Sequence, residues 1–314
     1  MRAEMRTLAV VVAGIVAASM AGMAQRNEAS PFESQIRGLE IAVASTGGET
    51  DGTGWLKLAV LYQDAARYGD AERAFEKAIR LLKTKDRNLY ADALDHLGTM
   101  YVERGRYAKA EPLEKEALAI REDAKDEIAI GTSYMHLAVL AYGRQDMTGA
   151  DADAEMAVSL LVPERPRDRV AEATPEEKMS ALVDLSLIKC ARGDSAGAVS
   201  ELNRALRIAH ANYEENSMPV GFLDFLLGNA YWKNGDARHA PALMKRGIDE
   251  MQQALGWGHP TYIAALRQYR NVLAQTGSSA QVEEVNQRIA LLEASSKMAG
   301  QPEKSGSFGI IAFR

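Results

Sequence analysis

A recurring spacing of large and small residues is the feature that most constrains the fold of this chain. The stretch Trp55–Ala78 contains a Trp-x2-Leu-small-x2-Tyr spacing followed by an Ala-x3-Phe-x2-Ala spacing. The residues that form these two spacings are Trp55, Leu58, Ala59, Tyr62, Ala71, Phe75 and Ala78. Because residues three and four apart share one face of an α-helix, the stretch predicts two amphipathic helices joined by a tight turn.

The same plan returns along the rest of the chain. The alanine near the start of each second helix stands at positions 71, 110, 150, 198 and 240, which gives spacings of 39, 40, 48 and 42 residues. A small residue precedes it in the first helix, for example Gly98, Ala138 or Gly228. Only a small side chain lets two helix axes approach closely at such a crossing. A chain of these units needs no single large core, because each unit packs only on its neighbours.

These spacings resemble the signature of the tetratricopeptide repeat (TPR) family. The long periods, with the segments Ala110–Arg121 and Leu255–Pro260, resemble the kinesin-light-chain-like variant found in many exported bacterial proteins. The resemblance implies an all-α fold, a right-handed α-α superhelix (solenoid) of about five and a half helix-turn-helix repeats. Lys189, Asp224 and Gly247 depart from the pattern, so we expect less regular packing in the fourth and fifth repeats.

The first residues read as an export signal. Arg2 and Arg6 precede a largely apolar run over residues 8–20, and small residues precede a cleavage site that we predict after Ala24. Residues 1–24 are therefore predicted to be a signal peptide, and the protein is expected to be exported, either periplasmic or secreted. An uncleaved membrane anchor is the alternative for this segment. No cysteine follows the apolar run, so we predict no lipid anchor.

The remaining chain divides into three predicted parts. Residues 25–51 are expected to form an N-terminal capping helix and a glycine-rich loop, and residues 52–294 the TPR repeat array. Residues 295–314 are polar and glycine-containing before an apolar end, which predicts a flexible C-terminal tail. Within the array, a proline-rich, charged stretch over residues 162–175 predicts a loop, with a new helix capped by Thr174.

Charge and motif content exclude several classes of function. The formal net charge of -6 disfavours non-specific binding to nucleic acid or to anionic lipid. The sequence has no G-x-S-x-G, no H-E-x-x-H, no glycine-rich phosphate loop after a strand and no Cys/His metal spacing. We therefore predict that the protein is not an enzyme and has no cofactor and no metal site. His96 and His136 occupy equivalent places in two repeats, so repetition explains them better than a metal site. The one cysteine, Cys190, is interpreted as a packed or groove-lining thiol.

The family resemblance places the partner-binding side chains on the concave face of the first helices. Carried over position by position, it predicts a groove that is apolar through the third to fifth repeats. The predicted groove residues are Leu56, Val60, Met135, Val139, Tyr142, Val183, Leu187, Phe222, Phe225, Asn229 and Trp232. The positions lack the lysine/asparagine set with which chaperone-binding repeats grip a peptide carboxylate. An apolar groove with aromatic residues predicts binding of an extended segment or a helix of a partner protein.

The sequence thus predicts a non-enzymatic protein-protein interaction scaffold or adaptor of the cell envelope. The partner is a protein or peptide that the sequence does not identify. Two alternatives stay open. One is a self-associating structural protein that uses the apolar tail over residues 308–313, a segment that also has the composition to dock in the groove. The other is a hydrolase whose site the motifs do not reveal.

Overall fold

The computed structural model describes residues 31–45, 51–164, 172–255, 260–276 and 279–298. Every regular element in these ranges is an α-helix, which confirms the predicted all-α fold class. The chain divides between residues 172 and 173 into two compact units, here called the N-terminal unit and the C-terminal unit. The predicted signal peptide and the predicted tail lie outside the described residues.

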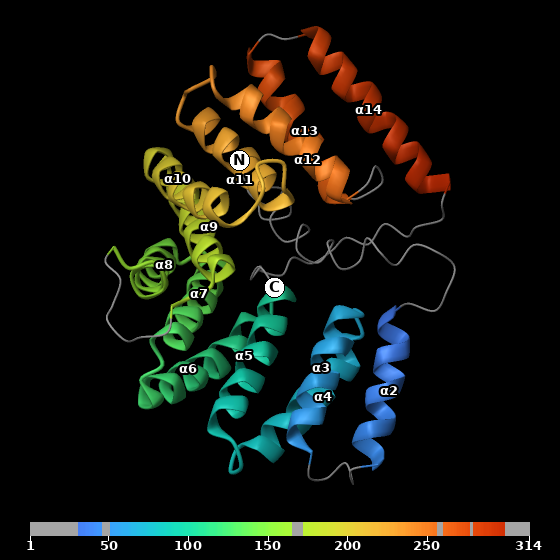
Figure 1. Cartoon of the computed structure of the whole chain (residues 1–314), viewed down its shortest axis with the longest axis vertical. Coiled ribbons are helices and arrows are strands. Elements are labelled where there is room, and N and C mark those ends of the chain that lie inside the picture. Colours follow the sequence, from blue (N-terminus) through green and yellow to red (C-terminus); the bar gives the residue numbers. More distant parts are fainter. Residues whose placement is uncertain (1–30, 46–50, 165–171, 256–259, 277–278, 299–314) are drawn as a thin grey trace. The chain divides into compact units, whose positions relative to one another are not determined.

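The described part of the N-terminal unit contains one leading helix and three helical hairpins (Figure 1). Helix α2 lies in the segment where the sequence predicts a capping helix, and it packs on the first hairpin. In each hairpin the first helix packs on the second, and the second helices α4 and α6 also pack on the first helix of the hairpin that follows them. The helices are α2 (Pro31–Ser45), α3 (Gly52–Asp64), α4 (Tyr68–Leu82), α5 (Arg87–Glu103), α6 (Tyr107–Ala124), α7 (Glu127–Gly143) and α8 (Met147–Leu161).

The C-terminal unit repeats the same plan with three more hairpins. Neighbouring helices again contact one another in chain order. They are α9 (Pro175–Arg192), α10 (Ser195–Asn212), α11 (Met218–Lys233), α12 (Ala240–Leu255), α13 (Pro260–Thr276) and α14 (Ser279–Met298). No helix among the described residues combines the length and the apolarity that a membrane crossing demands.

Polar caps explain where several of these helices begin. Asp51 accepts a hydrogen bond from the backbone N–H of Gly54, so α3 starts at Gly52, three residues before Trp55. Thr174 caps α9 as the sequence predicts. Its hydroxyl accepts from the N–H of Glu177 at 3.2 Å, and the Glu177 carboxylate accepts from the N–H of Thr174 at 2.7 Å. This reciprocal pair satisfies two backbone donors that the first turn of a helix otherwise leaves free.

A left-handed backbone conformation marks the turn inside five hairpins and fixes the repeat register. The residue seven places after the small residue of the first helix has a positive φ in each case. These residues are Ala66 (57°), Gly105 (68°), Gln145 (67°), Gly193 (90°) and Gly235 (83°). Glycine adopts this conformation without the steric cost of a Cβ atom. Counting back from Gly193 identifies Ser186 as the small residue of α9, in the hairpin whose sequence departs from the pattern.

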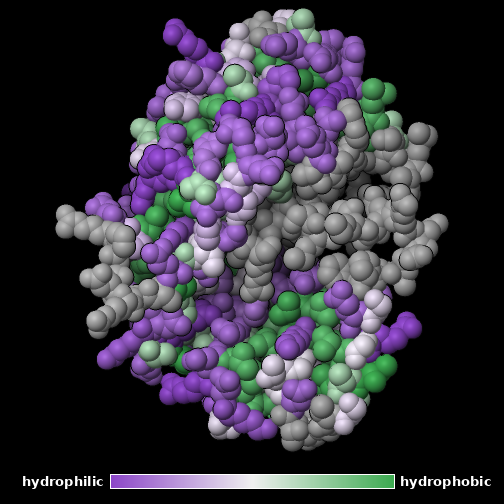
Figure 2. Space-filling model, viewed as in Figure 1, coloured by the Kyte–Doolittle hydropathy of each residue, from purple (hydrophilic) through white to green (hydrophobic). Residues whose placement is uncertain are grey.

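Small residues fill the helix crossings as predicted. Ala59, Ala71 and Ala138 are fully buried. At Gly228 an added Cβ would lie 2.9 Å from the backbone oxygen of Ala240, so α11 and α12 are too close for any larger residue there. The surface on the face shown in Figure 2 is mainly hydrophilic, with smaller hydrophobic areas.

Candidate functional site

The predicted groove residues of the N-terminal unit lie on two first helices, α3 and α7, and both of these contact the first helix between them, α5. We call the row of first-helix side chains on α3, α5 and α7 the inner row. Leu56, Met135 and Val139 are buried, whereas Val60 and Tyr142 are half-buried and reach the surface. The surface of the inner row therefore contains an apolar side chain, Val60, and an aromatic side chain with a hydroxyl group, Tyr142.

A hydrogen bond connects two first helices of this row. Gln63 Nε2 in α3 donates to Glu103 Oε1 in α5 at 3.3 Å. Burial raises the pKa of Glu103 to about 7, and the hydrogen bond from Gln63 opposes that rise. The edge of the inner row thus carries a carboxyl group that titrates near neutral pH.

The predicted groove residues of the C-terminal unit are more deeply buried. Phe222, Phe225 and Val183 are at most 2% exposed. Asn229 is also buried, and its side-chain oxygen accepts a hydrogen bond from Gln268 at 2.9 Å. Only two of the set, Leu187 and Trp232, are half-buried and reach the surface.

The close approach of α12 explains the burial of Phe225. At Gly247, in α12, an added Cβ would lie 2.8 Å from the Cβ of Phe225. Glycine at the place of the late repeat alanine lets α12 approach the backbone of α11 at Phe225, which is fully buried. Trp232 lies at the end of α11, and its indole N–H donates to Gln275 in α13 at 3.2 Å. The predicted partner surface of this unit therefore rests on Leu187 and Trp232.

A second candidate site is a buried group of charged residues in the second hairpin and the helix that follows it. Alignment of this hairpin with the other repeats shows that charged residues stand at positions that are apolar elsewhere. Asp95 stands at the position of Leu56, Glu114 at that of Phe75, and Arg121 at the positions of Leu82 and Leu161, all buried apolar residues. Ionisable residues have thus replaced apolar ones at three core positions. We call Asp95, Glu114, Arg121 and His136 the buried polar cluster.

Arg121 binds the carboxylate of Asp95 through two nitrogens. Its Nη1 donates to Oδ1 at 3.1 Å and its Nη2 to Oδ2 at 3.3 Å. The same nitrogens donate to Ser133 Oγ at 2.7 Å and to Asp92 Oδ1 at 3.0 Å. Both Arg121 and Asp95 are less than 10% exposed, so this ion pair lies in the interior, where an unpaired charge would be costly.

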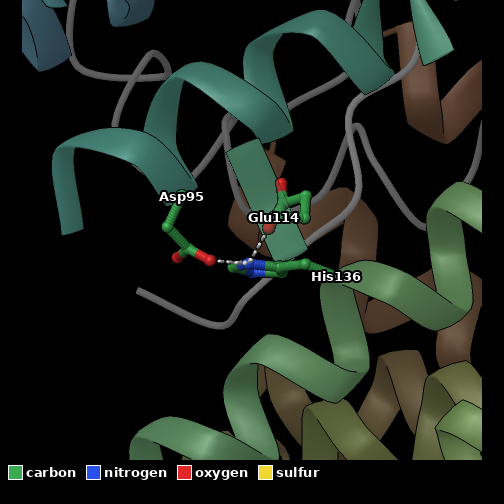
Figure 3. A group of neighbouring side chains, drawn as sticks. All are labelled: Asp95, Glu114 and His136. Atoms are coloured by element: carbon green, nitrogen blue, oxygen red, sulfur yellow. Dashed lines mark hydrogen bonds and ion pairs between the residues drawn. The ribbon is translucent and has the colours of Figure 1, made fainter. Parts of the chain in front are cut away.

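His136 lies between the two carboxylates of the cluster (Figure 3). Its Nδ1 is 2.8 Å from Asp95 Oδ1 and 3.7 Å from Glu114 Oε2. Burial acts to raise the pKa of Asp95, but the charges and hydrogen bonds of His136 and Arg121 outweigh it and hold the pKa far below its ordinary value. Burial and the neighbouring Asp95 carboxylate raise the pKa of Glu114 well above its ordinary value.

Sequence reasoning missed this cluster because it treated His136 as a repeat of His96. The two histidines have different surroundings. His96 stacks on Phe75, with ring centroids 6.1 Å apart, whereas His136 faces carboxylates. Glu114 received no role from the sequence, although its alignment with Phe75 was a usable signal. A charged residue at an otherwise apolar repeat position calls for a search for its partner, since buried charges are rarely left unpaired.

Buried carboxyl groups also occur in the C-terminal unit. Burial raises the pKa of Asp184, in α9, to about 8. Asp224, in α11, is fully buried, and Arg246 Nε lies 2.5 Å from its Oδ2. The Cys190 thiol is half-buried, and burial raises its pKa, which makes it a poor nucleophile at neutral pH.

Comparison with known proteins supports the interpretation of the repeats. A family model described as tetratricopeptide repeat matches residues 50–123. These residues span the first two hairpins, whose register the structure shows. The chain carries tetratricopeptide repeats over these residues. No curated protein sequence matches it significantly.

Solved structures of other TPR-like proteins have a similar fold. BtubC (BKLC) from P. vanneervenii is 21% identical with a TM-score of 0.61, over 77% of this chain and 96% of that one. A putative kinesin light chain from Podosopora anserina is 16% identical with a TM-score of 0.55, over 68% of this chain and 99% of that one. The apo form of RapI is 11% identical with a TM-score of 0.63, over 85% and 93% of the two chains. At these identities the likeness concerns the fold.

Proposed function

We propose that this TPR protein is a non-enzymatic scaffold that holds a segment of a partner protein along the inner row of its first helices. The observation that carries the proposal is the alignment of partly exposed side chains on α3, α5 and α7, with Val60 and Tyr142 at the surface. Rigid neighbouring helices hold these side chains in fixed positions. A partner segment then loses little of its binding energy to ordering the receptor.

The structural neighbours support a role in protein interaction. One of them is a Rap protein complexed with Competence and Sporulation Factor, 13% identical with a TM-score of 0.53 over 79% of this chain and 76% of that one. A helical repeat fold therefore holds a ligand in that protein. Another neighbour is described as aspartyl phosphate phosphatase F from Bacillus subtilis, 15% identical with a TM-score of 0.55, over 85% and 75% of the two chains. This likeness too is one of fold. The hydrolase alternative from the sequence analysis therefore stays open.

We also propose that the protein is exported and acts in the cell envelope. The basic and apolar pattern of residues 1–24 supports this location. The mature N-terminus, determined by mass spectrometry on protein from the native cell, is expected at residue 25. A mature chain that retains Arg2 and Arg6 in a soluble cell fraction would contradict export.

Site-specific photocrosslinking tests the partner surface. A photoreactive phenylalanine analogue in place of Tyr142, on the inner row, is expected to form a covalent adduct with a partner in native envelope extract. The matched control places the same analogue at Met156 in α8, where the native side chain is 45% exposed but lies on a second helix. Adducts at both positions, or at neither, would contradict a partner surface on the inner row.

A substitution supplies the second measurement. Tyr142→Ala is expected to weaken capture of the crosslinked partner by about tenfold or more, since aromatic anchors often dominate binding energy. Met156→Ala is expected to leave capture unchanged. Far-ultraviolet circular dichroism of both variants checks that the helices persist. In the C-terminal unit, Trp232→Ala tests the other partly exposed aromatic residue, with Leu291→Ala, 72% exposed in α14, as its control.

A further inference from the structure

The buried polar cluster brings three potential metal ligands from three helices to one place. Asp95 lies in α5, Glu114 in α6 and His136 in α7. One carboxylate oxygen of each acid and one ring nitrogen of the histidine lie within 4.8 Å of one another. Figure 3 shows the three side chains pointing toward a common point. Asp95 and Glu114 are buried, and His136 is 16% exposed at its side chain.

The environment of Glu114 is the observation that points to a bound ligand. The residue is 0% exposed, and neither of its carboxylate oxygens has a hydrogen-bond partner. It occupies the position that Phe75 holds in the first repeat and Leu202 in the fourth. A carboxylate at such a position loses its hydration, and without a hydrogen bond the 3.7 Å approach of His136 Nδ1 to its Oε2 compensates only in part. A positively charged partner at this point would remove that deficit.

The arginine of the cluster does not supply this charge to Glu114 through a hydrogen bond. The hydrogen bonds of Arg121 go to Asp95, Asp92 and Ser133, and none goes to Glu114. Arg121 carries one positive charge, and Asp92, Asp95 and Glu114 carry three negative charges when ionised. Metal ligands bind in their deprotonated forms, so with Glu114 ionised and the His136 imidazole neutral the group would have a formal charge of about -2. One divalent cation would balance it.

We propose that Asp95, Glu114 and His136 bind one divalent transition-metal ion of the zinc class. Two carboxylate oxygens and one imidazole nitrogen are a ligand set suited to such an ion. Metal–ligand bonds of about 2.0–2.2 Å place ligand atoms roughly 3–4.4 Å apart. The two distances from His136 Nδ1, 2.8 and 3.7 Å, are close to this range, so small movements of the side chains suffice.

The surroundings fit a structural ion rather than a catalytic one. Arg121 and its hydrogen bonds orient the Asp95 carboxylate, as outer groups commonly do for metal ligands. The side chain of His136 is 16% exposed, so a water molecule from the solvent would be the fourth ligand. An ion held by α5, α6 and α7 would join the second hairpin to the third, beside the inner row. This inference does not depend on the proposed partner surface.

Metal binding to the purified full-length chain tests the proposal. After treatment with a chelator and dialysis, the protein is titrated with ZnCl2 by calorimetry at neutral pH, and bound zinc is counted by elemental analysis. We expect one equivalent of zinc. Glu114→Gln and His136→Ala are expected to weaken binding by about 100-fold or more. The control Glu122→Gln changes an exposed carboxylate of the same helix, and His239→Ala removes a surface His–Asp pair; both should bind zinc as the unaltered protein does.

A variant that restores an apolar repeat residue separates loss of the ligand from loss of the fold. Glu114→Leu places at this position the residue type found at Leu202, so the helical circular dichroism should persist while zinc no longer raises the melting temperature. The proposal is overturned if the unaltered protein binds no stoichiometric zinc, or if Glu114→Gln binds it equally well. Either result would mean that Glu114 is not a ligand of a bound metal ion.

Discussion

Replacing Asp184 by asparagine should stabilise the C-terminal unit, and more so as the pH rises. Asp184 is buried in α9, and burial raises the pKa of its carboxyl group to about 8. An ordinary aspartate in the unfolded chain has a pKa of about 3.9. Between these values the unfolded chain is ionised while the folded chain keeps the proton. The stability that this group contributes is therefore complete below about pH 4, falls as the pH rises toward 8, and levels off above it.

The size of the effect follows from the shift. Each pKa unit corresponds to about 1.36 kcal/mol, so raising the pH from 5 to 8 should lower the free energy of unfolding by about 4 kcal/mol through this group alone. An asparagine side chain has nearly the same shape as aspartate and no charge, so the variant lacks this pH dependence. Between pH 5 and pH 8, the free energy of unfolding of Asp184→Asn should therefore rise by about 4 kcal/mol relative to that of the unaltered protein.

Urea unfolding followed by tryptophan fluorescence measures this difference. In a Trp55→Phe background the two remaining tryptophans, Trp232 and Trp257, both belong to the C-terminal unit. Asp249→Asn, which changes a partly exposed carboxylate of the same unit, serves as the control and should show no comparable pH-dependent gain. If Asp184→Asn shifts the free energy of unfolding equally at pH 5 and pH 8, burial does not keep this carboxyl group neutral.

Two further substitutions test the N-terminal cluster and a helix cap. Arg121→Leu introduces the residue of two other repeats but leaves the buried Asp95 carboxylate without its arginine, so it should lower the free energy of unfolding by about 3–5 kcal/mol. Combining it with Asp95→Met should restore most of the loss in urea unfolding, and no recovery would refute the pairing. Thr174→Ala removes the capping box of α9 and should cost about 1 kcal/mol. Thr276→Ala, at the end of α13, is the control for a lost threonine and should cost less, because its hydroxyl caps no helix start.

Much of the fold was predictable because the chain repeats one structural unit several times, so each copy tests the interpretation of the others. The spacing of Trp55, Ala59 and Tyr62 defines a helix face, and its recurrence around Gly98 and Ala138 shows that the same crossing returns. Local chemistry also sets helix starts, as the predicted cap at Thr174 shows. In α9, where the pattern weakens, the positive φ of Gly193 agrees with the register on which the sequence placed Val183 and Leu187.

The candidate sites were less predictable because exposure depends on how closely a second helix approaches. Position in the repeat placed Phe225 and Trp232 on the same face of α11. Gly247 lets α12 approach α11 at Phe225, which is buried, whereas Trp232 at the helix end stays half-buried. Sequence periodicity gives the direction of a side chain, but it does not give the distance to the neighbouring helix.

The sequence by itself determined the helical hairpins, their order and their small residues at the crossings, because these depend on spacings within one repeat. Only the tertiary structure decided that Asp95, Glu114 and His136 meet. They lie in three helices, up to 41 residues apart, and each by itself reads as a polar exception to the repeat pattern. Their convergence arises because the hairpins stack, and burial then makes the charge balance of the group a property that no single residue reveals.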